Sequence, residues 1–229
     1  MNIFSKVFIY SLVSTSFILL LPGCSDGPAT NKGDAGSSSM KLMDEVTSIT
    51  ELPSVLQESL SPDEKADLLK KILPQSDSSL SPDEQFQKLR EDATAGNAEA
   101  QNSLGTLFYS GHAISRDASG KILDYDLESA AAWFYRAAEQ GHAAAQFNLG
   151  LMYVEGQSVP KDSAKAVELF TKSAEQGNVD AQNNLGVMYF VGEGVSRDVD
   201  KAKQWFEKAA AQGNAEAKGN LEALQNAGN

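Results

Sequence analysis

Residues 141–176 read GHAAAQFNLGLMYVEGQSVPKDSAKAVELFTKSAEQ, and residues 177–212 read GNVDAQNNLGVMYFVGEGVSRDVDKAKQWFEKAAAQ. The two stretches share one pattern, so Leu149 and Leu185 lie 36 residues apart, as do Gly141 and Gly177. A fixed period of this size indicates stacked repeats, because one such unit cannot bury its own apolar face. The chain is therefore expected to be a repeat solenoid.

Each unit is predicted to contain two helices joined by a short turn. In residues 177–212 the first helix is expected from about Val179 to Val191, because apolar residues recur there at helical spacing. Asp198 is placed to cap the start of the second helix, and Gly213 to end it with a positive φ. Gly186, inside the first helix, is expected to allow a neighbouring backbone to approach closely.

The repeated pattern has the form A-x-x-x-L-G-x-x-Y, then G-x-G-V-x-x-D, then F-x-K-A/S-A-x-Q-G. This pattern resembles the Sel-1-like repeat, a relative of the tetratricopeptide repeat, over about Ala93 to Leu224. The resemblance implies an all-α solenoid of αα-hairpins, wound as a right-handed superhelix. It also implies a protein that binds other proteins; from its motifs the chain is expected to be no enzyme and to hold no cofactor.

The step from Leu104 to Leu149 is 45 residues, and the additional residues fall in the turn between the two helices of the first unit, near 118–126. Before the repeats, Ser61 and Ser81 each begin a Ser-Pro-Asp-Glu capping box, so two helices are expected there to cap the solenoid. The predicted organisation is a signal peptide at 1–23, a tether at 24–40, N-terminal helices at 41–92 and a repeat domain at 93–229, with units at about 97–140, 141–176 and 177–212 and a C-terminal cap at 213–229.

The N-terminus has the features of a lipoprotein signal peptide. Lys6 precedes an apolar run that ends in Leu21-Pro22-Gly23-Cys24, which resembles the bacterial lipobox L-x-G-C. Cys24 is the single cysteine of the chain and would carry the lipid that anchors it in a membrane. Ser25 after it favours, by the same resemblance, the outer membrane with the domain facing the periplasm. An ordinary signal peptide or a membrane-spanning anchor is the alternative.

No motif of the chain assembles a catalytic or metal site. Ser158 and Lys161 fit the S-x-x-K pattern of serine enzymes, but they lie in the predicted turn and no S-D-N or K-T-G partner exists. The two histidines, His112 and His142, lack metal-ligand spacing, and His142 is expected at a helix start. The net charge of −12 argues against a nucleic acid and favours a neutral or basic partner.

A second stripe on the first helix of each unit is the candidate binding surface, because it varies between units while the core pattern repeats. Its candidate residues are Tyr109, Phe147, Val154, Asn183 and Phe190. The alternative is that the stripe packs one unit against the next. Tyr125, in the extended turn of the first unit, is the other candidate, and its alternative is a loop that folds back onto its own repeat.

Three functions are consistent with this sequence. The first is a lipid-anchored adaptor that holds an unidentified protein or peptide in the periplasm. The second is an inhibitor, such as an immunity protein that neutralises a secreted toxin. The third is a hydrolase, since some relatives of the Sel-1-like family have carried a β-lactamase label. The missing catalytic motifs favour the adaptor over the hydrolase.

Overall fold

The computed structural model describes residues 61–73, 79–111, 115–116, 122–123 and 126–227. The predictions for the signal peptide, Cys24, the tether and Tyr125 lie outside these residues. The described helices are α3 (Pro62–Ile72), α4 (Pro82–Thr94), α5 (Ala98–Tyr109), α6 (Leu127–Glu139), α7 (Ala143–Glu155), α8 (Ser163–Glu175), α9 (Val179–Val191), α10 (Val199–Ala211) and α11 (Ala215–Ala227). Strands β1 (Ser115–Arg116) and β2 (Ile122–Leu123) pair antiparallel.

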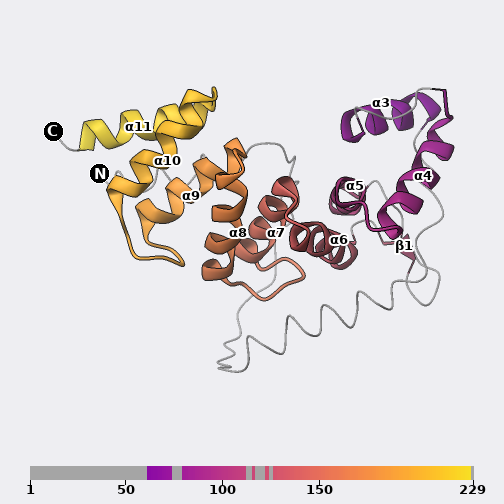
Figure 1. The fold of residues 1–229 in the computed structure, drawn as a ribbon, viewed down its shortest axis with the longest axis horizontal. Coiled ribbons are helices and arrows are strands. Elements are labelled where there is room, and N and C mark those ends of the chain that lie inside the picture. Colours follow the sequence, from indigo (N-terminus) through magenta and orange to yellow (C-terminus); the bar gives the residue numbers. More distant parts are fainter. Residues whose placement is uncertain (1–60, 74–78, 112–114, 117–121, 124–125, 228–229) are drawn as a thin grey trace, which may run out of the picture.

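The hairpins α5–α6, α7–α8 and α9–α10 stack in sequence order along an arc, which confirms the predicted all-α repeat solenoid (Figure 1). We call the first helix of each hairpin helix A and the second helix B; α11 is a terminal helix A. We call the side of the stack that the A helices form the inner side, and the side that the B helices form the outer side. The β1–β2 ribbon lies in the extended turn of the first unit, where no strand was predicted. No helix of the described residues is long and apolar enough to cross a membrane.

Side-chain caps fix where the helices begin. Asp198 accepts a hydrogen bond from the backbone N–H of Lys201 and begins α10, as predicted, and Gly213 follows this helix with φ +96°. Ser61 and Ser81 each form the predicted capping box with the glutamate three residues later. The short polar residues of the sequence therefore set the element boundaries.

A glycine in each helix A receives a phenyl ring from helix B of the same hairpin. A Cβ placed on Gly150 would lie 2.6 Å from Cε1 of Phe170, and one on Gly186 would lie 2.6 Å from Cε1 of Phe206. The expectation that Gly186 admits a neighbouring backbone is therefore wrong, because a side chain fills the space. The ring against the helix backbone allows the two helices of a hairpin to pack closely.

Buried glutamines connect each unit to the next. Gln182 of α9 donates from Nε2 to the carbonyl oxygen of Ala174 in the preceding unit, at 3.1 Å. Its Oε1 accepts from Nε2 of Gln212, at 2.8 Å. Both contacts recur around Gln146 and around Gln101. Each amide bonds to a carbonyl at the end of a helix, which also accepts from the N–H of the glycine after that helix, so the ladder joins units while the buried amide is paired.

The N-terminal helices continue the stack. Gln101 donates to the carbonyl oxygen of Ala93 at 3.0 Å, the same bond that joins the complete units, so α4 stands where a preceding helix B would stand. Leu69 of α3 is fully buried in the same core, and Ser103 of α5 donates to the carbonyl oxygen of Ile72 at 3.4 Å. α3 contains no glycine against which a ring could pack, and the contact between α3 and α4 is smaller than that within the complete hairpins.

Candidate partner-binding surface

The second stripe of the A helices forms the surface that we call the apolar floor. It consists of half-buried side chains of the A helices: Tyr109, Phe147, Leu151, Val154, Val187 and Phe190. The Tyr109 and Phe134 rings lie 6.4 Å apart, and the Phe147 and Phe170 rings 5.8 Å apart. One side of these residues thus packs on the core while the other stays accessible.

Asn183 does not belong to this surface, although the sequence placed it there. Its side chain is only 2% exposed, because α11 covers it. Nδ2 of Asn183 donates to Glu216 Oε2 at 3.3 Å, and its Oδ1 accepts from Nδ2 of Asn220 at 3.1 Å. Both polar groups of the Asn183 side chain therefore form hydrogen bonds that connect α9 to α11. This matches the alternative that the stripe packs one unit against the next.

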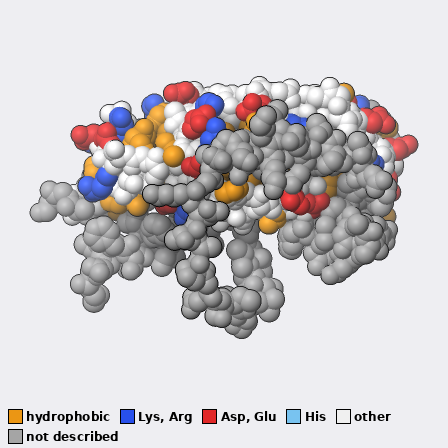
Figure 2. Space-filling view, turned by 90° about the horizontal axis from the view of Figure 1, so that it is seen from below, with side chains coloured by type: hydrophobic (Ala, Val, Ile, Leu, Met, Phe, Trp, Pro, Cys, Tyr) orange, Lys and Arg blue, Asp and Glu red, His pale blue; other side chains and the backbone are white. Residues whose placement is uncertain are grey.

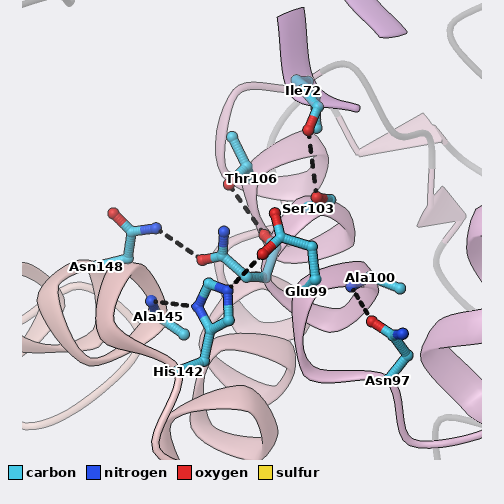
Figure 3. A network of polar contacts seen from close by, with 10 residues as sticks. Ile72, Asn97, Glu99, Ala100, Ser103, Thr106, His142, Ala145 and Asn148 are labelled. Atoms are coloured by element: carbon cyan, nitrogen blue, oxygen red, sulfur yellow. Dashed lines mark hydrogen bonds and ion pairs between the residues drawn. The ribbon is translucent and has the colours of Figure 1, made fainter. Parts of the chain in front are cut away.

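A polar network joins the first two complete units (Figure 3). Nδ1 of His142 accepts from the backbone N–H of Ala145 at 3.2 Å, which confirms the predicted helix-start role. Because Nδ1 accepts this bond, Nε2 carries the proton and faces Glu99 Oε2 at 2.8 Å. Nearby, Asn148 donates to Asn102 Oδ1 at 3.1 Å, the counterpart of the Asn220–Asn183 bond. His142 thus caps the start of α7 and contacts Glu99 of the preceding unit.

The environment of Tyr109 is partly desolvated. Burial raises the pKa of its phenol, the charge of Glu155 raises it further, and a hydrogen bond with Gln157 lowers it. Burial likewise raises the pKa of Glu155. Aromatic side chains that are shielded from water in this way are typical of the surfaces to which partner proteins bind.

The residues of the S-x-x-K pattern lie in the turn between α7 and α8, as predicted, and the lysine pairs with a carboxylate of the next unit. Ser158 lies in the turn with φ +54°, and the Lys161 ammonium pairs with Glu193 Oε1 at 3.3 Å. Within the described ranges, no three His, Cys, Asp or Glu side chains gather where they could hold a metal ion. Lys161 is thus part of an ion pair between two units.

Sequence reasoning missed a set of acidic residues that we call the inner carboxylates: Glu99, Asp180 and Glu216. Each lies in the first turn of a helix A and at the same position of the repeat, one helical turn before the position that Asn183 holds in α9. Extension of the stripe by one helical turn toward the N-terminus would have found them. The B helices differ, since α6, α8 and α10 each contain both basic and acidic residues. Blue and red side chains also lie close together on the face drawn in Figure 2.

Comparison with known proteins agrees with this architecture. The model of the Sel1 repeat family matches residues 98–142, 143–178 and 179–214. A crystal structure of a Sel1 repeat protein from Oxalobacter formigenes is 36% identical, with a TM-score of 0.52, over 60% of this chain and 96% of that one. No curated protein matches the chain.

A second similar structure is c5321, a protective antigen of uropathogenic Escherichia coli strains with an SLR fold. It is 40% identical, with a TM-score of 0.50, over 57% of this chain. The match covers 26% of the antigen, so the chain spans about a quarter of that protein's length.

Proposed function

Because the chain belongs to the Sel1 repeat family, whose members are protein-interaction scaffolds, we propose that it is a non-enzymatic adaptor. Its inner side holds a partner protein, and a lipid on Cys24 holds the chain in the cell envelope. The observation that carries the proposal is the contrast between the core and the apolar floor. The core residues repeat in every unit, whereas the residues of the apolar floor change from unit to unit.

The contrast is clearest between the second and third units. Their core residues are identical at the Leu, Gly and Tyr of the motif, as shared packing requires: Leu149 and Leu185, Gly150 and Gly186, Tyr153 and Tyr189. On the apolar floor, Leu151 of the second unit corresponds to Val187 of the third, and Val154 corresponds to Phe190. Variation at accessible positions on a fixed scaffold gives a solenoid its choice of partner.

Tyr109→Ala and Phe190→Ala are each expected to weaken partner binding by about 1–2 kcal/mol, because aromatic side chains supply much of the energy at protein interfaces. The measurement is crosslinked capture of partners from the cell envelope, with quantification of the same captured protein for each variant. Val199→Ala, which shortens an apolar side chain 37% exposed on α10, is the matched control and should leave capture unchanged. If both aromatic variants unfold as readily as core variants, the apolar floor serves packing and the proposal is wrong.

We further propose that the chain is a lipoprotein of the outer membrane that faces the periplasm. The support is the apolar run followed by Leu21-Pro22-Gly23-Cys24 and by Ser25. Several acyl chains on one cysteine would give stable anchoring, since each buried CH₂ contributes about 0.8 kcal/mol.

Cys24→Ala is expected to abolish lipid attachment and to leave an uncleaved precursor, because the thiol is the acceptor of the lipid. Growth with a radioactive fatty acid, followed by electrophoresis, measures both effects. A Ser25→Ala variant, which keeps the thiol, is the control and should label like the parent. Equal labelling of the Cys24→Ala variant would contradict the proposal.

A further inference from the structure

Charge is distributed unequally between the two kinds of helix. The complete A helices α5, α7 and α9 contain no lysine and no arginine, whereas every helix B contains at least one. The single cation of α11, Lys218, stands in the register of the ladder residue Gln182 and not of the apolar floor. Every full charge on α5, α7 and α9 is therefore negative, and a cation reaches the apolar floor from the turn after α9, where the Arg197 guanidinium lies 5.5 Å from the centroid of the Phe190 ring.

Helix stability does not explain this pattern. The helix dipole favours acidic residues in the first turn, where Glu99, Asp180 and Glu216 lie, and basic residues in the last turn. The B helices follow the second preference, with Arg136, Lys172 and Lys208 in their last turns. The last turns of α5, α7 and α9 hold no basic residue and carry members of the apolar floor instead. The A helices α5, α7 and α9 thus lack the basic residues that would stabilise their last turns.

The inner carboxylates also lack cationic partners. Among the described residues, none of the three pairs with lysine or arginine; Glu99 faces the His142 ring, and the other two accept from asparagine amides. The Asp180 charge adds to burial in raising the pKa of Glu216. The two carboxylates therefore repel each other, and a cation placed between them would relieve that repulsion.

We propose that the inner side binds a basic amphipathic segment of the partner protein, whose apolar side chains contact the apolar floor and whose lysines or arginines face the inner carboxylates. This inference rests on the proposed adaptor function and specifies its partner. A second copy of the chain fits poorly, because it carries the same carboxylates and a net charge of −12. An anionic lipid surface would be repelled for the same reason.

Three fluorescein-labelled synthetic peptides of equal length test the proposal with the full-length protein in detergent: one of Lys and Leu, one of Glu and Leu, and one of Lys and Ser. Fluorescence anisotropy at low salt gives each affinity. The Lys/Leu peptide is expected to bind at least about tenfold more tightly than either of the others, because only it meets both the charge and the apolar surface. Its affinity should fall as salt is added.

Two matched variants distinguish attraction of the peptide by the inner carboxylates from attraction by the overall negative charge of the protein. The inner triple variant Glu99→Gln, Asp180→Asn, Glu216→Gln keeps the side-chain oxygens that accept the internal hydrogen bonds, and is expected to lose about tenfold in affinity for the Lys/Leu peptide. The outer triple variant Glu128→Gln, Glu175→Gln, Asp200→Asn removes as much charge from exposed positions of the B helices and should bind like the parent.

Equal affinity of the two triple variants, or equal affinity for the Lys/Leu and Glu/Leu peptides, would overturn the proposal. Thermal unfolding of each variant shows that the fold is intact. These outcomes are distinct from failure of the adaptor function. That function fails if Phe190→Ala leaves capture of the envelope partner unchanged, whatever the charge of that partner.

Discussion

Leu185→Ala is expected to lower the free energy of unfolding by about 2–5 kcal/mol, the usual range for a buried leucine cut to alanine. Leu185 is fully buried in α9, where its side chain belongs to the main hydrophobic core. The loss combines the transfer energy of the removed atoms with a cavity that neighbouring helices fill only in part. Because adjacent units stack on one another, weakening α9 is expected to loosen its neighbours as well.

Leu221→Ala is the matched control, since Leu221 stands at the same repeat position in α11 but is only half-buried. Its cost should be clearly smaller, because less apolar surface is lost and water can reach the site. Urea unfolding followed by circular dichroism measures both variants. A neutral Leu185→Ala, or equal costs at the two positions, would show that the repeat register is assigned incorrectly.

The repeat period alone was enough to predict the helices of the complete units. Val179 and Val191 bound α9 as expected, because apolar spacing and caps act within one unit. The repeat period could not predict which group fills the space beside Gly186. A mid-helix glycine indicates close approach, but whether backbone or ring approaches depends on Phe206, twenty residues later, and on how the hairpin closes.

The candidate surface was predictable only in part. The helical wheel placed Phe147 and Phe190 correctly on the inner side, but it could not show that α11 buries Asn183. Burial between units depends on how A helices meet across the stack, which the sequence of one unit does not contain. The inner carboxylates were missed because a first-turn acid has an ordinary explanation in the helix dipole. Only the lack of cations in the last turns of the A helices makes their charge informative.

Gly194→Ala is expected to cost about 3 kcal/mol or more, the second large effect. A Cβ at this position would lie 2.1 Å from the carbonyl oxygen of Ser163 in the preceding unit. A backbone atom at the start of α8 cannot rotate away as a flexible side chain can, so the two units would have to separate. The contact is further held by Glu193, which accepts from Ser163 Oγ at 2.8 Å and pairs with Lys161. The left-handed φ of +69° adds about 1–2 kcal/mol for any residue with a Cβ.

Gly177→Ala separates the two contributions to this cost. Gly177 also has a positive φ, +92°, but a Cβ there would meet nothing within 4 Å, so its replacement should cost only the backbone strain. Ser158 stands at the register of Gly194 with φ +54°, which shows that a side chain in the left-handed region is tolerated where no carbonyl blocks it. Thermal unfolding measures both glycine variants, and Gly194→Ala is expected to melt at the lower temperature. If Gly194→Ala melts no lower than Gly177→Ala, the close approach of the two turns does not contribute to the stacking of the units.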